Sequence, residues 1–299
     1  MSTLSEDLKA PKTTLSEFID LTLRISNHRQ NTVESYYADH RGYRIQHSIN
    51  GTNKKYIRPV HIELFIWDSK EFEKQSKILV RILNEIKEGK RDFSNEEHTN
   101  INSTIYTIQQ SIGIGLDLLF TPNSARKHVG NRFEELLRVI TTDLGLENTK
   151  MVFKVPYEAD GKKQTYKSET DIIISPYKEI KSTPSQLNPD ELVVSVKTTS
   201  KDRMGKMFLD KLLLQEMFNL DKVKVVGVFL NDVQRKEGTK TSFTIVPGQF
   251  IVYSQYIEKM DGVYYLDIPD SIRNKTPFNS MIKPFSEFIT SDIWTLLGS

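Results

Sequence analysis

Cysteine is absent from this sequence of 299 residues. The chain therefore has no disulfide, no thiolate zinc site and no cysteine nucleophile, which fits a reducing cytoplasm. Long apolar runs are absent too, because no stretch approaches the roughly 18 residues that a membrane-spanning helix needs. The first seven residues lack the basic start and the apolar core of a signal peptide. We expect a cytoplasmic protein with no membrane partner.

A strong net charge is also lacking, since 41 Lys and Arg face 39 Asp and Glu and leave a formal charge of +2. A protein that merely coats nucleic acid usually carries more positive charge. An enzyme that grips one short DNA site can instead concentrate its basic residues in a cleft, so the net charge does not argue against such an enzyme. The length suits one large domain or two small ones and is ample for a buried core.

The hydrophobic pattern predicts an α/β protein with a mixed central sheet flanked by helices. Helices are expected over 71–88, 101–119, 132–142 and 203–218, although Gly113 and Gly115 weaken the second of them. Strands are expected over 151–157, 170–175, 192–198, 223–230, 244–253 and 264–268, a loop over 91–100 and a turn over 161–167. Helix, strand, strand, strand, helix, strand is a mixed-sheet order. A boundary near residue 100 would separate an N-terminal region, 1–100, from a core of 101–299.

An acid and a lysine stand at the ends of two predicted strands. Asp171 opens a strand of three isoleucines, and Lys197 ends the next strand 26 residues later. Neighbouring strands would bring the two side chains together at one edge of the sheet. A carboxylate there can hold a hard divalent cation, and a lysine beside it can orient or deprotonate an attacking water. This arrangement suits phosphodiester hydrolysis; the alternatives are a solvent-facing Asp at a strand start and a surface ion pair.

A metal site normally needs more than one acid. The usual pattern is an Asp followed by Glu-x-Lys, but the position two before the lysine is Ser195, which has no carboxylate. Asp210 lies 13 residues after Lys197 on the next predicted helix, which could fold back to place it near the missing position. The alternative is an ion pair of Asp210 with Lys206 or Lys211 on a solvated helix face.

The segment 197–203 reads K-T-T-S-K-D-R and resembles the catalytic and recognition segment of the EcoRII/SsoII/PspGI-type restriction endonucleases, a branch of the PD-(D/E)xK nucleases. Members of this branch replace the Glu of Glu-x-Lys and take the acid from the following helix, 13 residues after the lysine. The resemblance therefore implies that Asp171 and Asp210 bind metal and that Lys197 positions or activates water. Asp210 stands where the branch usually has Glu, which is a departure from its pattern.

A second segment, 124–134, reads S-A-R-K-H-V-G-N-R-F-E and is similar to a family pattern of small and basic residues followed by Gly-x-x-Phe/Leu-Glu at the opening of a helix. By this match Glu134 is an additional active-site acid near the metal. The alternative is that Glu134 and Glu135 favour a helix N-terminus through charge–dipole attraction. The matched segments lie in the family's order and span residues 124–210.

Lys201, Asp202 and Arg203 match the family's (Arg/Lys)-(Asp/Glu)-Arg motif, which implies recognition of CC and GG half-sites. An acid can accept hydrogen bonds from cytosine N4 groups, while Arg or Lys donates to guanine O6 and N7 in the major groove. The alternative is a solvated turn in which Asp202 is the N-cap of the next helix.

The resemblance implies a PD-(D/E)xK fold in a prokaryotic, cytoplasmic enzyme of a restriction–modification system. Its expected activity is Mg²⁺-dependent cleavage of both strands of a palindrome that contains CC and GG halves, with 5′-phosphate ends. The expected partners are double-stranded DNA and a second copy of the chain, as a homodimer or a tetramer built from dimers. Region 1–100 would wrap DNA or mediate dimerisation. The alternatives are another PD-(D/E)xK nuclease, of repair or resolvase type, and a DNA-binding module with a degenerate nuclease fold.

Overall fold

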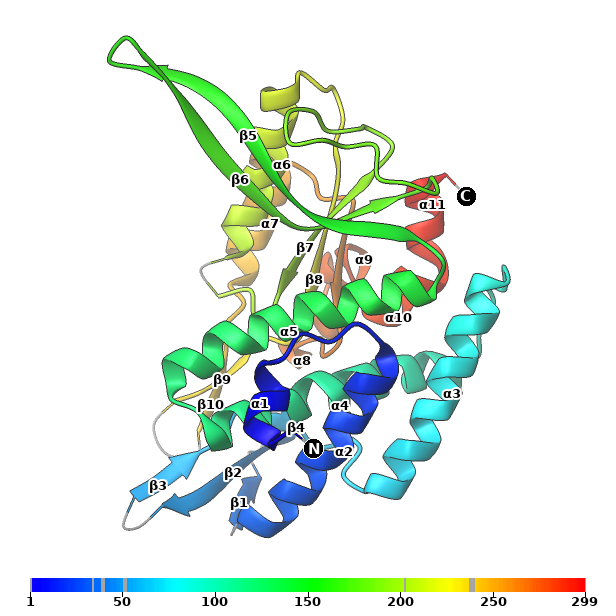
Figure 1. The fold of residues 1–299 in the computed structure, drawn as a ribbon, viewed down its shortest axis with the longest axis vertical. Helices are drawn as coiled ribbons and strands as arrows, with labels where there is room; N and C mark the ends of the chain where they lie inside the picture. The colour runs from blue at the N-terminus through cyan, green and yellow to red at the C-terminus, as the bar shows by residue number, and fades with distance from the viewer. Residues whose placement is uncertain are drawn as a thin grey trace.

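A six-stranded mixed sheet forms the centre of the protein in the computed structural model, which describes residues 2–33, 35–38, 41–50, 53–201, 203–236 and 240–298 (Figure 1). Its strand order is β12-β11-β8-β7-β6-β5. Strands β5, β6 and β7 are antiparallel, whereas β7, β8, β11 and β12 run parallel. The strands span Glu147–Ala159 (β5), Lys162–Ser175 (β6), Leu192–Lys197 (β7), Lys224–Phe229 (β8), Gly262–Tyr265 (β11) and Ile282–Pro284 (β12). The predicted mixed sheet is confirmed.

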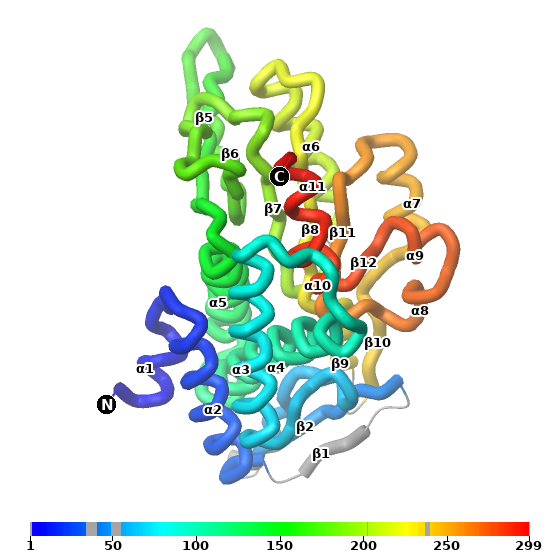
Figure 2. Tube along the Cα trace, turned by 90° about the vertical axis from the view of Figure 1, so that its right-hand side faces the viewer, coloured from blue at the N-terminus to red at the C-terminus, as the bar shows by residue number. Residues whose placement is uncertain are grey.

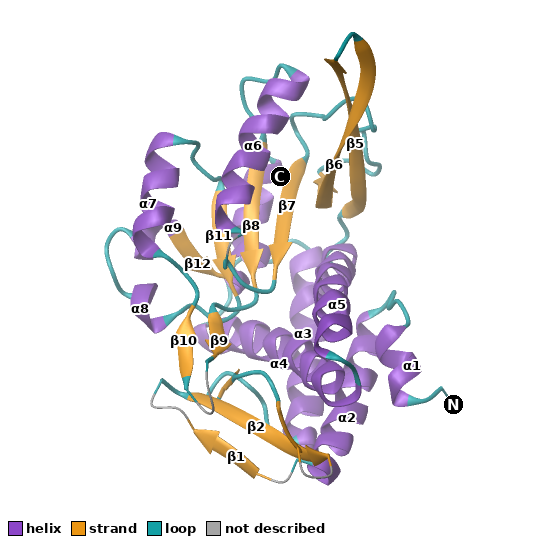
Figure 3. Cartoon of the chain, turned by 90° about the vertical axis from the view of Figure 1, so that its left-hand side faces the viewer, coloured by secondary structure: helices purple, strands orange, loops and turns teal. Residues whose placement is uncertain are grey.

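Helices cover both faces of this sheet, which explains why β7 and β8 are apolar at nearly every position. Val194 and Val226 pack on one face, and Val193 and Val225 on the other. The first face is covered by α5, α10, η1 and α11, and the second by α6 and α7 together with α8 and α9, as opposite views show (Figures 2 and 3). These elements are α5 (Pro122–Asp143), α6 (Met204–Phe218), α7 (Pro247–Tyr256), α8 (Asp270–Arg273), α9 (Phe278–Met281), α10 (Phe285–Glu287), the π-helical η1 (Phe288–Asp292) and α11 (Ile293–Leu297).

Helices α2, α3 and α4 of the N-terminal part contact α5, and this part also contains helix α1 and a small sheet (Figure 3). The helices are α1 (Leu4–Lys9), α2 (Leu15–Thr32), α3 (Ser69–Lys87) and α4 (Asn95–Leu119). The sheet consists of β1 (Ser35–Ala38), β2 (Tyr43–Asn50), β3 (Asn53–Tyr56) and β4 (Val60–His61). The boundary expected near residue 100 falls inside α4, and one buried core runs from Leu8 and Phe18 through Ile105 to Phe133 and Val194. The division at residue 100 and the role of region 1–100 stay predictions.

Helix α4 is longer than the sequence pattern indicates. The expected loop over 91–100 is wrong beyond Ser94, because Ser94 and Glu97 form a capping box that starts the helix at Asn95. Gly113 and Gly115 do not interrupt α4 either. A Cβ on Gly113 would lie 2.2 Å from Nη1 of Arg58. At this position the glycine permits close packing rather than a break in the helix.

Two other predictions are wrong in detail. Residues 162–167 of the turn expected over 161–167 belong to β6, and only Asp160 and Gly161, with φ of 52° and 68°, turn the chain between β5 and β6. The strand expected over 244–253 is mostly helix α7, whose first residue is Pro247. Just before it, the strand β10 (Thr241–Phe243) pairs with β9 (Val233–Arg235). The β5–β6 hairpin extends well beyond the body of the molecule (Figure 1).

None of the helices within the described ranges combines the length and the apolar character needed to cross a membrane.

Candidate active site

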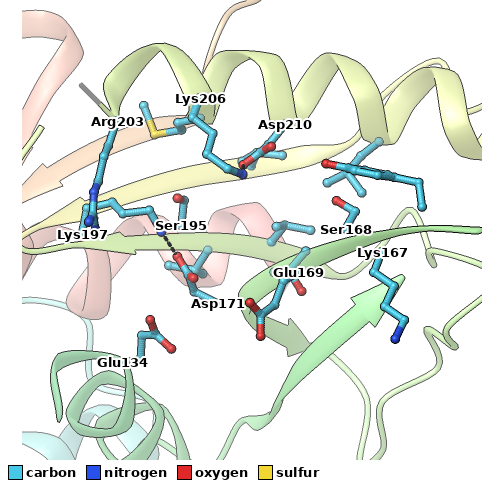
Figure 4. Close-up of a pocket in the computed structure, with 17 residues that line it drawn as sticks. Glu134, Lys167, Ser168, Glu169, Asp171, Ser195, Lys197, Arg203, Lys206 and Asp210 are labelled. Atoms are coloured by element: carbon cyan, nitrogen blue, oxygen red, sulfur yellow. Dashed lines mark hydrogen bonds and ion pairs between the residues drawn. The ribbon is translucent and has the colours of Figure 1, made fainter. Parts of the chain in front are cut away.

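One pocket of about 440 Å³ lies between β6, β7 and α6 and contains the four side chains that the sequence indicates for catalysis (Figure 4). Asp171 comes from β6, Lys197 from the end of β7, Glu134 from α5 and Asp210 from α6. Arg203 lines the same pocket. One site is therefore built from residues that are up to 76 positions apart in the sequence, from Glu134 to Asp210.

A β-bulge places Asp171. Thr149 of β5 pairs with Ile173, but Met151 pairs with Thr170, so Asp171 and the residue after it lie opposite the single residue Lys150. A bulge bends its strand and re-aims the side chain of the extra residue. Asp171 is the tenth residue of β6 and not its first, so the alternative of a solvent-facing acid at a strand start is wrong.

Lys197 and Asp171 are in direct contact. The ammonium Nζ donates to Oδ2 of Asp171, and the backbone N–H of Val196 donates to the same oxygen at 2.7 Å. The two side chains are only 17% and 16% exposed, so this is not the surface ion pair of the alternative interpretation. A carboxylate next to an amine, both partly withdrawn from solvent, can hold a cation and orient a water molecule.

Glu134 approaches Asp171 from the side of α5. It is the thirteenth residue of a helix that begins at Pro122, so neither the expected helix opening near Gly130 nor the alternative of a helix N-terminus is correct. Burial and the negative charge of Asp171 raise the pKa of the Glu134 carboxyl. Lys150 lies 3.4 Å from Glu134 Oε2 and partly offsets this effect.

Asp210 faces the pocket and is also held in an ion pair. Lys206 Nζ donates to Asp210 Oδ2 at 2.5 Å, as the alternative interpretation predicts, whereas Lys211 is buried and pairs with Asp261. Lys206 and Asp210 extend from α6 above β7, with Ser195 beneath them (Figure 4). The face of α6 that lines the pocket consists of Arg203, Lys206, Met207, Asp210 and Leu214.

The donor set suits a hard cation, although it does not form a complete cage. Among the side chains that the structure describes, no three of the types His, Cys, Asp and Glu converge closely enough to hold a metal ion. Asp171 and Glu134 nevertheless repel each other electrostatically, and a cation between two such carboxylates relieves that repulsion. Mg²⁺ is commonly bound through one or two carboxylates together with substrate phosphates and water. The carboxylates of Asp171 and Glu134 are of the ligand type that Mg²⁺ takes.

Three charged residues of the site were not found from the sequence. Lys150 Nζ lies 3.2 Å from Glu169 as well as 3.4 Å from Glu134, so it links two acids at the pocket edge. Glu169 precedes Asp171 by two residues, a spacing that could have identified it as a second acid on the strand. Lys206 entered the sequence analysis only as a surface partner of Asp210. No local pattern marks Lys150, because its position opposite the bulge depends on strand register.

The three predicted base-reading residues are not equivalent in the structure. Arg203 is the N-cap of α6, the position that the alternative interpretation gave to Asp202, and its side chain reaches toward Lys197 (Figure 4). Lys201 is exposed and donates to Oε1 of Gln234 on β9 at 3.2 Å. Asp202 lies outside the described residues.

No family model and no curated protein matches this sequence. In structure, the chain is similar to the type IIP restriction endonuclease Kpn2I, with a TM-score of 0.70, 20% sequence identity, and coverage of 95% of this chain and 91% of that one. A second similarity is to restriction endonuclease PspGI in complex with substrate DNA. Its TM-score is 0.40 at 12% identity, over 77% of this chain and 92% of that one. The similarity to Kpn2I confirms the predicted fold class: this chain has the α/β fold of a restriction endonuclease.

Proposed function

We propose that this protein is a type II restriction endonuclease that cuts both strands of a palindromic DNA site in the presence of Mg²⁺. The observation that carries the proposal is the single pocket that Asp171, Lys197, Glu134 and Asp210 line together with Arg203. The similarity to Kpn2I over nearly the whole chain supports it, because the named activity of that protein needs this kind of site.

The residues have distinct roles in the proposed reaction. Asp171 and Asp210 hold Mg²⁺, and Glu134 assists as an additional acid. The bound ion would neutralise the charge that develops on the scissile phosphate. Lys197 uses its ammonium to position the water that attacks phosphorus, or takes a proton from it in the neutral amine form, and Asp171 keeps the lysine side chain in place through their direct contact. Cleavage leaves a 5′-phosphate and a 3′-hydroxyl.

The proposed site contains CC and GG halves, as in CCGG, CCNGG or CCWGG, with or without flanking bases. Support comes from the resemblance of segment 197–203 to the EcoRII/SsoII/PspGI branch, and from the donor and acceptor chemistry of Lys201, Asp202 and Arg203. Arg203 and Lys197 line the same pocket, so base reading and cleavage would occur side by side.

The proposed assembly is a homodimer, or a tetramer built from dimers. A palindrome has a two-fold axis, and a two-fold symmetric protein presents one catalytic pocket to each strand. The location in a prokaryotic cytoplasm beside a matching DNA methyltransferase belongs to the same proposal.

Digestion of phage DNA of known sequence tests this function. The purified protein is incubated with Mg²⁺ or with EDTA, and the ends of the products are sequenced. We expect every Mg²⁺-dependent end to map to one palindrome with CC and GG halves. Cutting confined to branched or nicked DNA would contradict the proposal in favour of a repair or resolvase nuclease. Sequence-specific binding without any cutting would contradict it in favour of a degenerate binding module.

A further inference from the structure

Asp232 is a buried carboxylate just beyond the end of β8, and it joins three segments that are distant in the sequence. It is 1% exposed. Its Oδ1 accepts from the backbone N–H of Ser200 and from Thr244 Oγ1, both at 2.6 Å. Its Oδ2 accepts from Tyr265 Oη at 2.6 Å. The carboxylate therefore ties the turn after β7 to the chain after β10 and to β11.

No cation compensates this charge within the part of the chain that the structure describes, since Lys, Arg and His make no ion pair with Asp232 there. Neutral donors alone hold it, and burial raises the pKa of the Asp232 carboxyl. A buried acid without a counter-ion costs stability, whereas an apolar group of similar size would not. The contribution of this carboxylate therefore lies in the geometry that it imposes on the three segments.

Hydrogen bonds lead from Asp232 to the start of α6. The carbonyl of Ser200 accepts from the backbone N–H groups of Arg203 and Met204, both at 3.0 Å. Asp232 fixes the N–H of the same Ser200. The position of Arg203 thus depends on Asp232 through one intermediate residue.

The strand that follows Asp232 supports Lys201, the other proposed base-reading residue that the structure describes. Gln234 on β9 accepts from Lys201 Nζ at 3.2 Å, and its own amide nitrogen lies 3.4 Å from Ser242 Oγ on β10. The β9–β10 hairpin therefore holds Lys201, while the carboxylate at its base holds the backbone that leads to Arg203.

We propose that Asp232 is a positioning residue for sequence selectivity, with Gln234 as its counterpart for Lys201. This inference rests on the proposed restriction endonuclease function. The catalytic contact is anchored separately, because Lys197 Nζ bonds to Asp171 and the backbone of β7 is held up to Lys197 by its parallel pairing with β8. Removing the Asp232 carboxylate should therefore lower selectivity far more than the cleavage rate at the preferred site.

Base contacts depend on placement to within roughly half an ångström. A bidentate base contact contributes about 1–3 kcal/mol of discrimination, so its loss lowers the preference for the correct base roughly tenfold or more. In Asp232→Asn, an amide nitrogen replaces one acceptor oxygen, so the hydrogen bond with Tyr265 Oη must reverse its direction or the bonds from Ser200 N–H and Thr244 Oγ1 are lost, and the negative charge that all three donors share is removed. In Gln234→Ala, the support of Lys201 is lost together with the contact to Ser242, while the hydrogen bonds of the Asp232 carboxylate stay.

The experiment uses the full-length protein and a pool of DNA duplexes with a randomised segment. Cut molecules are sequenced, and selectivity is expressed as the cleavage of the best site divided by that of each single-base variant. This ratio does not depend on the fraction of active protein, so a merely structural defect does not change it. We expect Asp232→Asn to lower the ratio at least about tenfold. Gln234→Ala should lower it only at the positions that Lys201→Ala affects.

Asp261→Asn is the matched control. Asp261 accepts from the N–H of Val225 at 2.8 Å and from Lys211 Nζ at 2.9 Å, near the opposite end of β8. Its replacement should lower the melting temperature but leave the ratio at the wild-type value. Tyr265→Phe removes a single donor to Asp232 and provides a milder variant in case Asp232→Asn does not fold.

The outcomes separate the two proposals. A wild-type protein that cuts without sequence preference would overturn the function, and the inference with it. A selective wild-type protein would leave the function standing. If Asp232→Asn, or Tyr265→Phe where the former is unfolded, then keeps the wild-type ratio, the positioning role of Asp232 is overturned alone.

Discussion

Asp210 lines the pocket and forms an ion pair with Lys206. Its role in the proposed site depends on whether its carboxylate binds Mg²⁺ in place of this lysine. Its side chain is 29% exposed and that of Lys206 is 59% exposed. Exposed ion pairs along a helix contribute only about 0.3–0.5 kcal/mol. A divalent cation therefore competes easily with Lys206 for this carboxylate. The shorter Asp, where the related enzymes usually have Glu, remains compatible with a metal-binding role.

The variant Asp210→Asn isolates this role. We expect its cleavage rate to fall by about a hundredfold or more, because even the groups that support metal ligands contribute roughly 10–100-fold and Asp210 is proposed to bind the ion directly. Its half-saturating Mg²⁺ concentration should rise, which a purely structural defect would not cause. Rates are measured at several Mg²⁺ concentrations on DNA with the mapped site.

Glu216→Gln provides the comparison on the same helix. Glu216 is exposed and does not line the pocket, so its replacement should leave the rate and the Mg²⁺ dependence unchanged. Equal behaviour of Asp210→Asn and Glu216→Gln would mean that Asp210 does not bind the metal.

At the scale of elements, the sequence predicted the sheet and its covering helices where the pattern was local. The β-branched run that ends at Lys197 and the apolar run of β8 mark buried strands directly. The errors have non-local causes. The arm of β6 over 162–169 is polar because it extends away from the core, and Gly113 lies within a helix because Arg58 packs against it.

The candidate site was likewise predictable only where local sequence patterns place its residues. Asp171 and Lys197 come from strands that are consecutive in the sequence and paired in the sheet, so the period of a strand and the pairing of consecutive strands suffice to bring them together. The bulge opposite Lys150 and the three bonds to Asp232 could not be predicted, because both depend on how distant segments align. The functional roles of all these residues stay predictions.

At the scale of the whole molecule, a buried acid links the small N-terminal sheet to the central sheet. Asp267, which follows β11, is 1% exposed and accepts from Tyr43 Oη of β2 at 2.9 Å. Burial raises the pKa of the Asp267 carboxyl to about 7. The carboxyl of an unfolded Asp releases its proton at about pH 4. Between that pH and about pH 7, the folded protein therefore keeps a proton that the unfolded chain has already released. Through this group, stability is greatest at low pH and is lost as the pH rises toward 7.

We therefore expect the contribution of Asp267 to the free energy of unfolding to fall between about pH 4 and pH 7. The change amounts to a few kcal/mol at most, since one pKa unit corresponds to about 1.4 kcal/mol. Asp267→Asn keeps the acceptor for Tyr43 and should remove this part of the pH dependence. Urea unfolding at several pH values measures it, with the exposed Asp221→Asn as a control. Identical pH profiles for the wild type and Asp267→Asn would show that Asp267 titrates as an ordinary carboxyl.

The most direct test of the account compares Lys197→Ala with Lys224→Ala on DNA that contains the mapped site. Lys224 begins β8, at the opposite end of the same pair of strands, and its Nζ lies 3.3 Å from the carbonyl of Asp190. We predict that Lys197→Ala loses Mg²⁺-dependent cleavage by at least about a hundredfold. It should still bind the site specifically in a gel-shift assay, and Lys224→Ala should cut like the wild type. Cleavage by Lys197→Ala at the wild-type rate would contradict the assignment of this pocket as the active site.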